Sequence, residues 1–209
     1  MHAWRCAIIS FGLVILLSTS GCLDRFYEKP VTLPVTTIPV VTVPTENFTA
    51  TVSPSEMALQ LSDLPGDYFL RDRTVAAYDE QLQINRDLGW MQGYRVSFYR
   101  MELDNDDLTG IMQTLDVYPL ENMNKLYSIE KDALLQTESP FEKYEIPFPV
   151  VGDMSIAVRK TDPNDRYKVV TYTVLFANRN VLETITMTGT TTDYEVLKTV
   201  VKKASARVR

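Results

Sequence analysis

Histidine and cysteine are nearly absent from this chain of 209 residues. His2 is the single histidine, and Cys6 and Cys22 are the two cysteines. Ser-His-Asp catalysis, Cys-His catalysis and histidine zinc sites require a histidine, whereas thiol redox centres require paired cysteines. His2 and Cys6 both lie in the N-terminal segment interpreted below as a leader. The remaining chain therefore lacks the residues for any of these sites.

Glycine and positive charge are also scarce. The chain has 8 glycines and contains neither GxGxxG nor GxxxxGK[ST], which excludes these two phosphate-binding loops. Lys and Arg number 21 against 27 Asp and Glu, for a formal net charge of −6, so nucleic acid is not an expected partner. A basic cluster closes the chain, and we interpret it as cations that favour a helix C-terminus: Lys198, Lys202, Lys203, Arg207 and Arg209.

The first 21 residues have the layout of a secretory signal peptide. A short segment carrying Arg5 precedes the apolar run CAIISFGLVILL, and small residues follow at positions 18–21. A helix of that apolar run, from Cys6 to Leu17, reaches only about 18 Å, well short of the ~30 Å hydrocarbon core of a membrane. The sequence therefore predicts a cleaved leader over 1–21 in preference to a permanent transmembrane anchor.

Ser20-Gly21-Cys22 resembles the lipobox of prokaryotic lipoprotein precursors, archaeal ones included, although Thr19 stands where leucine is usual. The resemblance implies that a lipid is attached to Cys22 and holds the chain on the extracytoplasmic face of the cell membrane. Lipidation also accounts for a lone cysteine in an oxidising compartment. The alternatives are an ordinary secreted protein with an incidental cysteine, or an uncleaved signal anchor.

A proline-rich stretch follows over 22–56. Pro30, Pro34, Pro39, Pro44 and Pro54 are separated mainly by valine and threonine, a composition that opposes helix and favours extended backbone. At ~3.1 Å per residue, such a tether would hold a domain up to roughly 90 Å from the lipid. Asn47 begins an Asn-Phe-Thr triplet, the acceptor pattern for N-glycosylation, which also requires an organism with that machinery.

Residues 57–209 carry the alternation and turn signals of one globular domain. A short element over 57–64 precedes a strand that starts near residue 68, and 75–88 has helical character. The later pattern predicts a hairpin of 94–103 with 110–118, a helix through 120–135, strands at 154–159, 167–177 and 180–188, and a closing helix after an N-cap at Asp193. Hairpins interleaved with helices predict an α+β fold, with an antiparallel sheet of five to six strands packed against two to three helices.

The second half of the domain resembles PsbP-like extracytoplasmic domains. Gly152-Asp153-Met154-Ser155 leads into one strand, and Asn180-Val181 restarts another before the amphipathic last helix. The resemblance covers about 152–207 and rests on this pattern rather than on a catalytic signature. It implies a PsbP-like fold outside the cytoplasm, and we interpret Asp153 as a residue that fixes a turn.

Acidic residues leave two other functions open. A hydrolase needs two facing carboxylates, but no spacing singles out a pair among Asp104, Asp106, Asp107, Asp153 and Glu183. Calcium could bind at 104–107 or 162–165, although both groups lack the glycine and downstream glutamate of an EF-hand loop. Asp and Asn also build hairpin turns by bonding nearby backbone, and we favour this interpretation. No metal or cofactor is expected.

The aromatic residues supply one candidate recognition surface. Trp90, Tyr94 and Tyr99, together with Tyr68 and Phe69, could line such a surface, since aromatic rings contribute strongly to interfaces. The competing interpretation, which we favour for Trp90, is a core anchor. The sequence thus predicts a lipid-anchored extracytoplasmic module that does not catalyse a reaction and that binds a protein or small-molecule ligand it does not identify.

Overall fold

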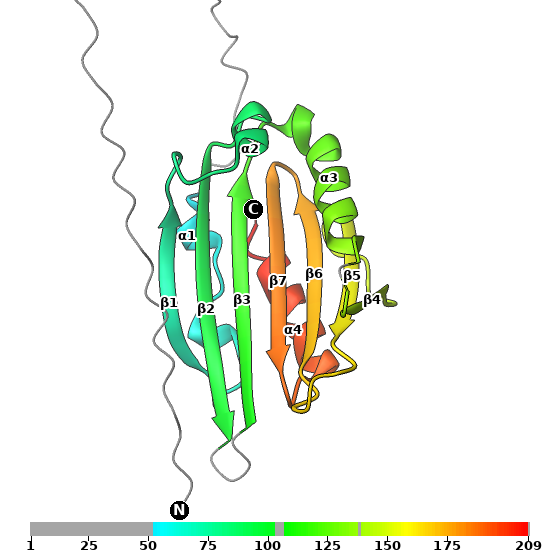
Figure 1. Ribbon diagram of the computed structural model, residues 1–209. Coiled ribbons are helices and arrows are strands. Elements are labelled where there is room, and N and C mark those ends of the chain that lie inside the picture. The colour runs from blue at the N-terminus through cyan, green and yellow to red at the C-terminus, as the bar shows by residue number, and fades with distance from the viewer. Residues whose placement is uncertain (1–51, 103–106, 138, 209) are drawn as a thin grey trace, which may run out of the picture. The chain divides into compact units, whose positions relative to one another are not determined.

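The computed structural model describes residues 52–102, 107–137 and 139–208. Cys22 and Asn47 lie outside these ranges. The described chain forms an α+β domain in which one antiparallel sheet has helices on both faces (Figure 1). The sheet has seven strands in the order β1-β2-β3-β7-β6-β5-β4, so two hairpins, β2-β3 and β6-β7, meet at its centre.

The strands are β1 (Phe69–Ala76), β2 (Gln92–Glu102), β3 (Asp107–Val117), β4 (Glu142–Glu145), β5 (Met154–Thr161), β6 (Val170–Asn178) and β7 (Val181–Gly189). The helices are α1 (Pro54–Met57), α2 (Gln83–Asp87), α3 (Met123–Leu135) and α4 (Tyr194–Ser205), with short 3-10 turns η1 (Leu61–Asp63) and η2 (Leu120–Asn122). Asp193 caps α4, because its Oδ1 accepts hydrogen bonds from the backbone N–H groups of Glu195 (2.8 Å) and Val196 (3.2 Å).

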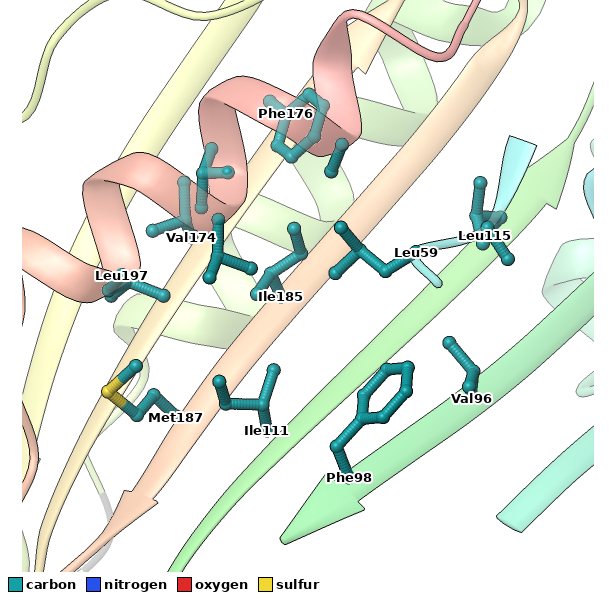
Figure 2. Packing of buried hydrophobic residues seen from close by; sticks show 14 of the residues in the cluster. Leu59, Val96, Phe98, Ile111, Leu115, Val174, Phe176, Ile185, Met187 and Leu197 are labelled. Atoms are coloured by element: carbon teal, nitrogen blue, oxygen red, sulfur yellow. The ribbon is translucent and has the colours of Figure 1, made fainter. Parts of the chain in front are cut away.

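The larger core lies between the sheet and α4. Alternate residues of the central strands point to this face, as the period of a strand requires, and Figure 2 shows Phe98, Ile111, Ile185 and Met187 on it. Val174 and Phe176 of β6 belong to the same core. Helix α4 completes it with Leu197, Val200, Val201 and Ala204, all spaced to lie on one side of the helix.

The N-terminal segment also covers this face. Met57, Ala58 and Leu59 are buried in the same core, and Val52 packs against it. The Asp63 carboxylate pairs with Arg207 just beyond α4, at 2.7 Å, and Lys203 of α4 donates to the Asp63 backbone oxygen at 2.7 Å. The segment that follows the proline-rich stretch is therefore bound to both the sheet and α4.

A smaller core lies on the opposite face of the sheet, beneath α3. Met123 and Leu126 of α3 are buried with Ile156 of β5, Leu175 of β6 and Leu182 of β7. Figure 1 shows α3 on the viewer's side of the sheet and α4 behind it. Because α3 packs on β5, β6 and β7, the part of this face nearer β1 and β2 lies outside its cover.

The Gly-Asp-Met-Ser sequence has a structural explanation. Gly152 has φ of +63°, and a Cβ there would lie 2.2 Å from the Ala177 backbone oxygen, so only glycine fits. The Asp153 carboxylate accepts a hydrogen bond from the Arg179 backbone N–H at 2.7 Å, and the Ser155 hydroxyl oxygen accepts one from the Val151 N–H at 3.2 Å. The motif thus joins the start of β5 to the β6-β7 turn, as expected for Asp153.

Both sheet edges are protected against pairing with another chain. Strand β1 is interrupted by a register shift between Leu70 and Asp72, and three consecutive charged residues, Arg71 to Arg73, follow that irregularity. The other edge, β4, has 4 residues. Charge, bulges and short length are the usual devices that keep exposed edges from aggregating.

The α+β antiparallel class is confirmed, but the counts of strands and helices are corrected. The sheet has seven strands instead of five to six, because the short, charged sequence EKYE forms β4 against β5. The helix expected over 75–88 begins only at Gln83, since Val75 and Ala76 pair with β2 as part of β1. Four α-helices replace the expected two to three, and α1 and α2 are only 4 and 5 residues long.

Candidate functional site

Part of the sheet face opposite α4 is exposed, and we call it the open face. It extends from β1 across β2, β3 and β7 to β6, next to the area that α3 covers. Strand alternation and register bring its residues together, because directly paired residues share a face. Its exposed and half-buried side chains are those of Phe69, Ser97, Tyr99, Met112, Thr171, Thr173, Thr186 and Thr188.

Threonines form a ladder along one half of the open face. Thr186 lies opposite Thr173, with 3.3 Å between their hydroxyl oxygens, and Thr188 donates a hydrogen bond to the Thr171 hydroxyl at 3.1 Å. Each threonine side chain also carries a methyl group. The ladder therefore offers hydroxyls and apolar patches at the regular spacing of neighbouring strands.

The other half of the open face is aromatic and apolar. Phe69 is 57% exposed, and its ring centroid lies 5.7 Å from that of Tyr99, which is directly opposite on β2. Met112 is also exposed. A shallow groove of about 390 Å³ runs between β1 and β7, with Arg71 and Asp72 at one end and Thr186 and Thr188 at the other. This surface can bind a ligand that has both apolar and hydrogen-bonding parts.

The structure does not bring Trp90, Tyr94 and Tyr99 together as one surface. Trp90 is 4% exposed and belongs to the smaller core, which agrees with the favoured interpretation of a core anchor. Tyr94 points to the face of the sheet that α4 covers and packs against the larger core. Tyr99 alone of these three lies on the open face, where its partner is Phe69. Closeness in the sequence does not place these three residues on one surface, because successive residues of a strand point to opposite faces of the sheet.

Trp90 is fixed by a carboxyl that sequence reasoning missed. Its indole N–H donates to Asp116 Oδ1 at 2.7 Å, and burial raises the pKa of Asp116. Gly93 allows this contact, since a Cβ there would lie 2.4 Å from Asp116 Oδ1. Burial, and then the charge of Asp116, raise the pKa of Glu130 on α3. No local pattern signals a Trp-Asp bond across 26 residues.

Glu183, a candidate carboxylate from the sequence, lies inside the larger core and is 0% exposed. Its Oε1 accepts a hydrogen bond from Gln113 Nε2 at 2.5 Å, and Gln113 Oε1 accepts one from the Leu59 backbone N–H at 2.7 Å. Its Oε2 has no hydrogen-bond partner. Burial raises the pKa of Glu183 to about 8, although the bond from Gln113 lowers it. This carboxyl is therefore a core element that ties the N-terminal segment to β3 and β7.

The acidic turn at 162–165 bonds to its own backbone. Asp162 accepts from the Asn164 N–H at 2.9 Å, and Asp165 accepts from the Tyr167 N–H at 2.9 Å and the Val169 N–H at 3.0 Å. Among the residues that the structure describes, no group of three or more His, Cys, Asp or Glu could hold a metal ion. Asp104 and Asp106 lie outside the described residues.

Within the described ranges, no helix is long and apolar enough to cross a membrane.

The comparisons with known proteins concern the fold. No protein-family model and no curated protein matches this chain. Among solved structures, the chain is similar to the extracellular domain of PknH from Mycobacterium tuberculosis, with a TM-score of 0.55 and 10% sequence identity. The match covers 75% of this chain and 96% of that domain. The chain thus forms an α+β sheet domain in which α4 covers one face of the sheet, and α3 covers part of the other face and leaves the open face exposed.

Proposed function

We propose that this chain is a membrane-anchored extracytoplasmic lipoprotein whose domain binds a ligand on its open face without catalysing a reaction. The observation that carries the binding role is the open face itself, where exposed Phe69 and Met112 and half-buried Tyr99 lie beside the threonine ladder. Exposed apolar side chains gathered on one surface and combined with polar groups are typical of binding sites.

The location outside the cytoplasm is supported by two independent features. The first is the leader with Cys22 at its end, which predicts lipid attachment. The second is the likeness of fold to a domain that is extracellular in another protein. A PsbP-like relationship stays a prediction from the sequence pattern.

Two other functions have less support. A calcium-dependent structural role would use acidic turns, but the described turn at 162–165 directs Asp oxygens to backbone N–H groups. A hydrolase would use two facing carboxylates. Asp116 and Glu130 are one candidate pair among the described residues, because the charge of Asp116 adds to burial in raising the pKa of Glu130. Asp116 is bonded to Trp90, which favours a structural role for it.

Membrane fractionation tests the anchor. Cys22→Ser removes the thiol that a lipid would modify, so the chain should move from the membrane to the soluble fraction. If the variant stays in the membrane fraction as firmly as the parent, the leader is an uncleaved anchor and the lipid is not what holds the chain.

A pull-down from the native membrane, with the tether intact, tests the open face. Tyr99→Ala together with Met112→Ala should abolish recovery of a bound ligand, because both side chains lie on that face. Val75→Ala is the matched control, since Val75 is 71% exposed on the other face of the sheet. Equal recovery with all three proteins would place the binding surface elsewhere.

A further inference from the structure

The outer side of α4 and the loop beside it differ from the rest of the described surface, and we call this region the α4 side. A groove of about 500 Å³ separates the loop from the helix. The loop contributes apolar residues from Phe148 to Val151, and the helix contributes Lys198 and Lys202 together with Glu195, Thr199 and Ser205. Val150 is 84% exposed, the highest value among the exposed large apolar residues of the described chain.

The loop is fixed in place, so the exposure of Val150 is built into the fold. Phe148 and Val151 on either side of it pack against the larger core. The Phe148 ring meets Tyr194 edge-on, with ring centroids 5.9 Å apart, and the Tyr194 hydroxyl donates to the Pro147 backbone oxygen. Val150 therefore projects from a braced loop.

The two lysines are placed beside this apolar tip. Lys198 and Lys202 are one helical turn apart and line the same groove. Lys198 pairs with Glu195 at 2.6 Å, whereas no acidic side chain of the described residues pairs with Lys202. A fixed apolar tip flanked by lysines is the combination that binds the interface of an anionic membrane.

The proline-rich stretch joins the domain on this side as well. Val52 and Glu56 line a second hollow together with Lys203, Ala206 and Arg207 at the end of α4. Cys22 precedes Val52 in the sequence by 30 residues. The described part of the chain therefore begins beside α4 and not on the open face.

We propose that the α4 side docks on the membrane surface, with anionic lipid headgroups bound by Lys198 and Lys202 and with Val150 inserted among them. This inference rests on the proposed lipid anchor, which would keep the domain close enough for a contact between a few residues to form. The chain as a whole carries a net charge of −6, so an anionic surface repels it overall and the contact depends on the local lysines. Docking there would turn the open face, on the opposite side of the sheet, away from the membrane and towards a ligand.

The test is vesicle binding by the full exported chain carrying Cys22→Ser, which removes the lipid but leaves the α4 side intact. The parent should bind vesicles that mix phosphatidylglycerol with phosphatidylcholine at low ionic strength, and should not bind pure phosphatidylcholine. Lys198→Ala with Lys202→Ala should weaken binding about 25-fold, because each lysine near an anionic membrane contributes a factor of about five. High salt should also weaken the binding, because it screens the attraction between the lysines and the anionic lipids.

A matched control is available on the other side of the sheet. Lys125→Ala with Lys131→Ala changes the charge by the same amount on α3 and should leave binding unchanged. In the same chain, a fluorescent label on Val150→Cys should be quenched by nitroxide lipids, whereas a label on Thr188→Cys of the open face should not.

Three results would overturn the docking proposal: no binding of the parent to anionic vesicles, equal weakening by the α3 pair, or quenching at position 188 instead of 150. The parent could instead bind inorganic phosphate but no vesicles, and lose that phosphate binding when Lys198 and Lys202 are replaced by alanine. This result would assign the groove to a soluble anion. The anchor itself is judged separately by membrane fractionation. If Cys22→Ser releases the chain but vesicles do not bind, the anchor stands and the docking surface is wrong.

Discussion

The buried carboxyl of Glu183 should make the stability of the domain fall as pH rises. Burial raises the pKa of Glu183 from its ordinary value of 4.5 to about 8 in the folded chain. The folded chain therefore holds this proton more tightly than the unfolded chain between those two values. The contribution is complete below about pH 4.5 and is lost as the pH rises towards 8.

The size of this effect follows from the pKa difference. A pKa difference of one corresponds to a free energy of about 1.4 kcal/mol. A rise in the pKa of Glu183 from 4.5 to about 8 therefore corresponds to about 5 kcal/mol of unfolding free energy. Domains are stable by only about 5 to 15 kcal/mol, so a loss of this size is a large part of the total. The physical cause is burial: the carboxyl is 0% exposed in the larger core, to which α4 contributes the apolar residues Leu197, Val200, Val201 and Ala204.

Glu183→Gln isolates the effect, because glutamine keeps an acceptor for Gln113 and cannot ionise. We expect urea unfolding, followed by circular dichroism from pH 5 to pH 9, to show a steep fall in the parent and a much shallower one in the variant. Burial also raises the pKa values of Asp116 and Glu130, which gives both proteins a residual slope of the same sign. Glu142→Gln, on the exposed part of β4, should keep the parental slope. Parallel profiles for parent and Glu183→Gln would refute the argument.

Three further changes test the local structure by thermal or urea unfolding. Gly152→Ala should destabilise the domain by more than about 1 kcal/mol, since its φ is positive and its Cβ would meet the Ala177 oxygen; an unchanged midpoint would contradict this. Asp193→Ala should cost about 1 kcal/mol by removing the cap of α4, whereas Asp193→Asn should retain most of it. Trp90→Phe should cost about 1 to 3 kcal/mol by leaving Asp116 buried without its indole donor, and a neutral result would mean that water replaces that donor.

The sequence was informative wherever structure depends on neighbouring residues. The hairpin of β2 and β3 was predictable because alternating residues flank the acidic sequence DNDD, and α4 was predictable from Asp193 and its apolar stripe. The same local reasoning placed a helix over 75–88 and missed β4. In both places pairing with a distant strand decides the conformation: Val75 lies opposite Tyr94, and Tyr144 lies opposite Arg159.

The candidate site was less predictable than the fold. Tyr99 and Phe69 were both named as candidates, but they and the threonines become neighbours only through the register of five strands, β1, β2, β3, β7 and β6. The strand period of two can separate residues onto two faces, yet the sequence does not say which face a helix will cover. That is settled by where α3 and α4 pack, and α3 leaves the open face uncovered.

By itself the sequence determined the scarcity of histidine and cysteine, the proline-rich stretch and the α+β pattern, and it predicted a leader over 1–21. These are properties of composition and of short-range periodicity, which do not depend on what packs against them. Only the tertiary structure decided that Glu183 is a buried core residue, that Trp90 bonds Asp116, and that the open face and α4 lie on opposite sides of the sheet. Each of these depends on contacts between residues far apart in the chain, and such contacts also determine burial and ionisation.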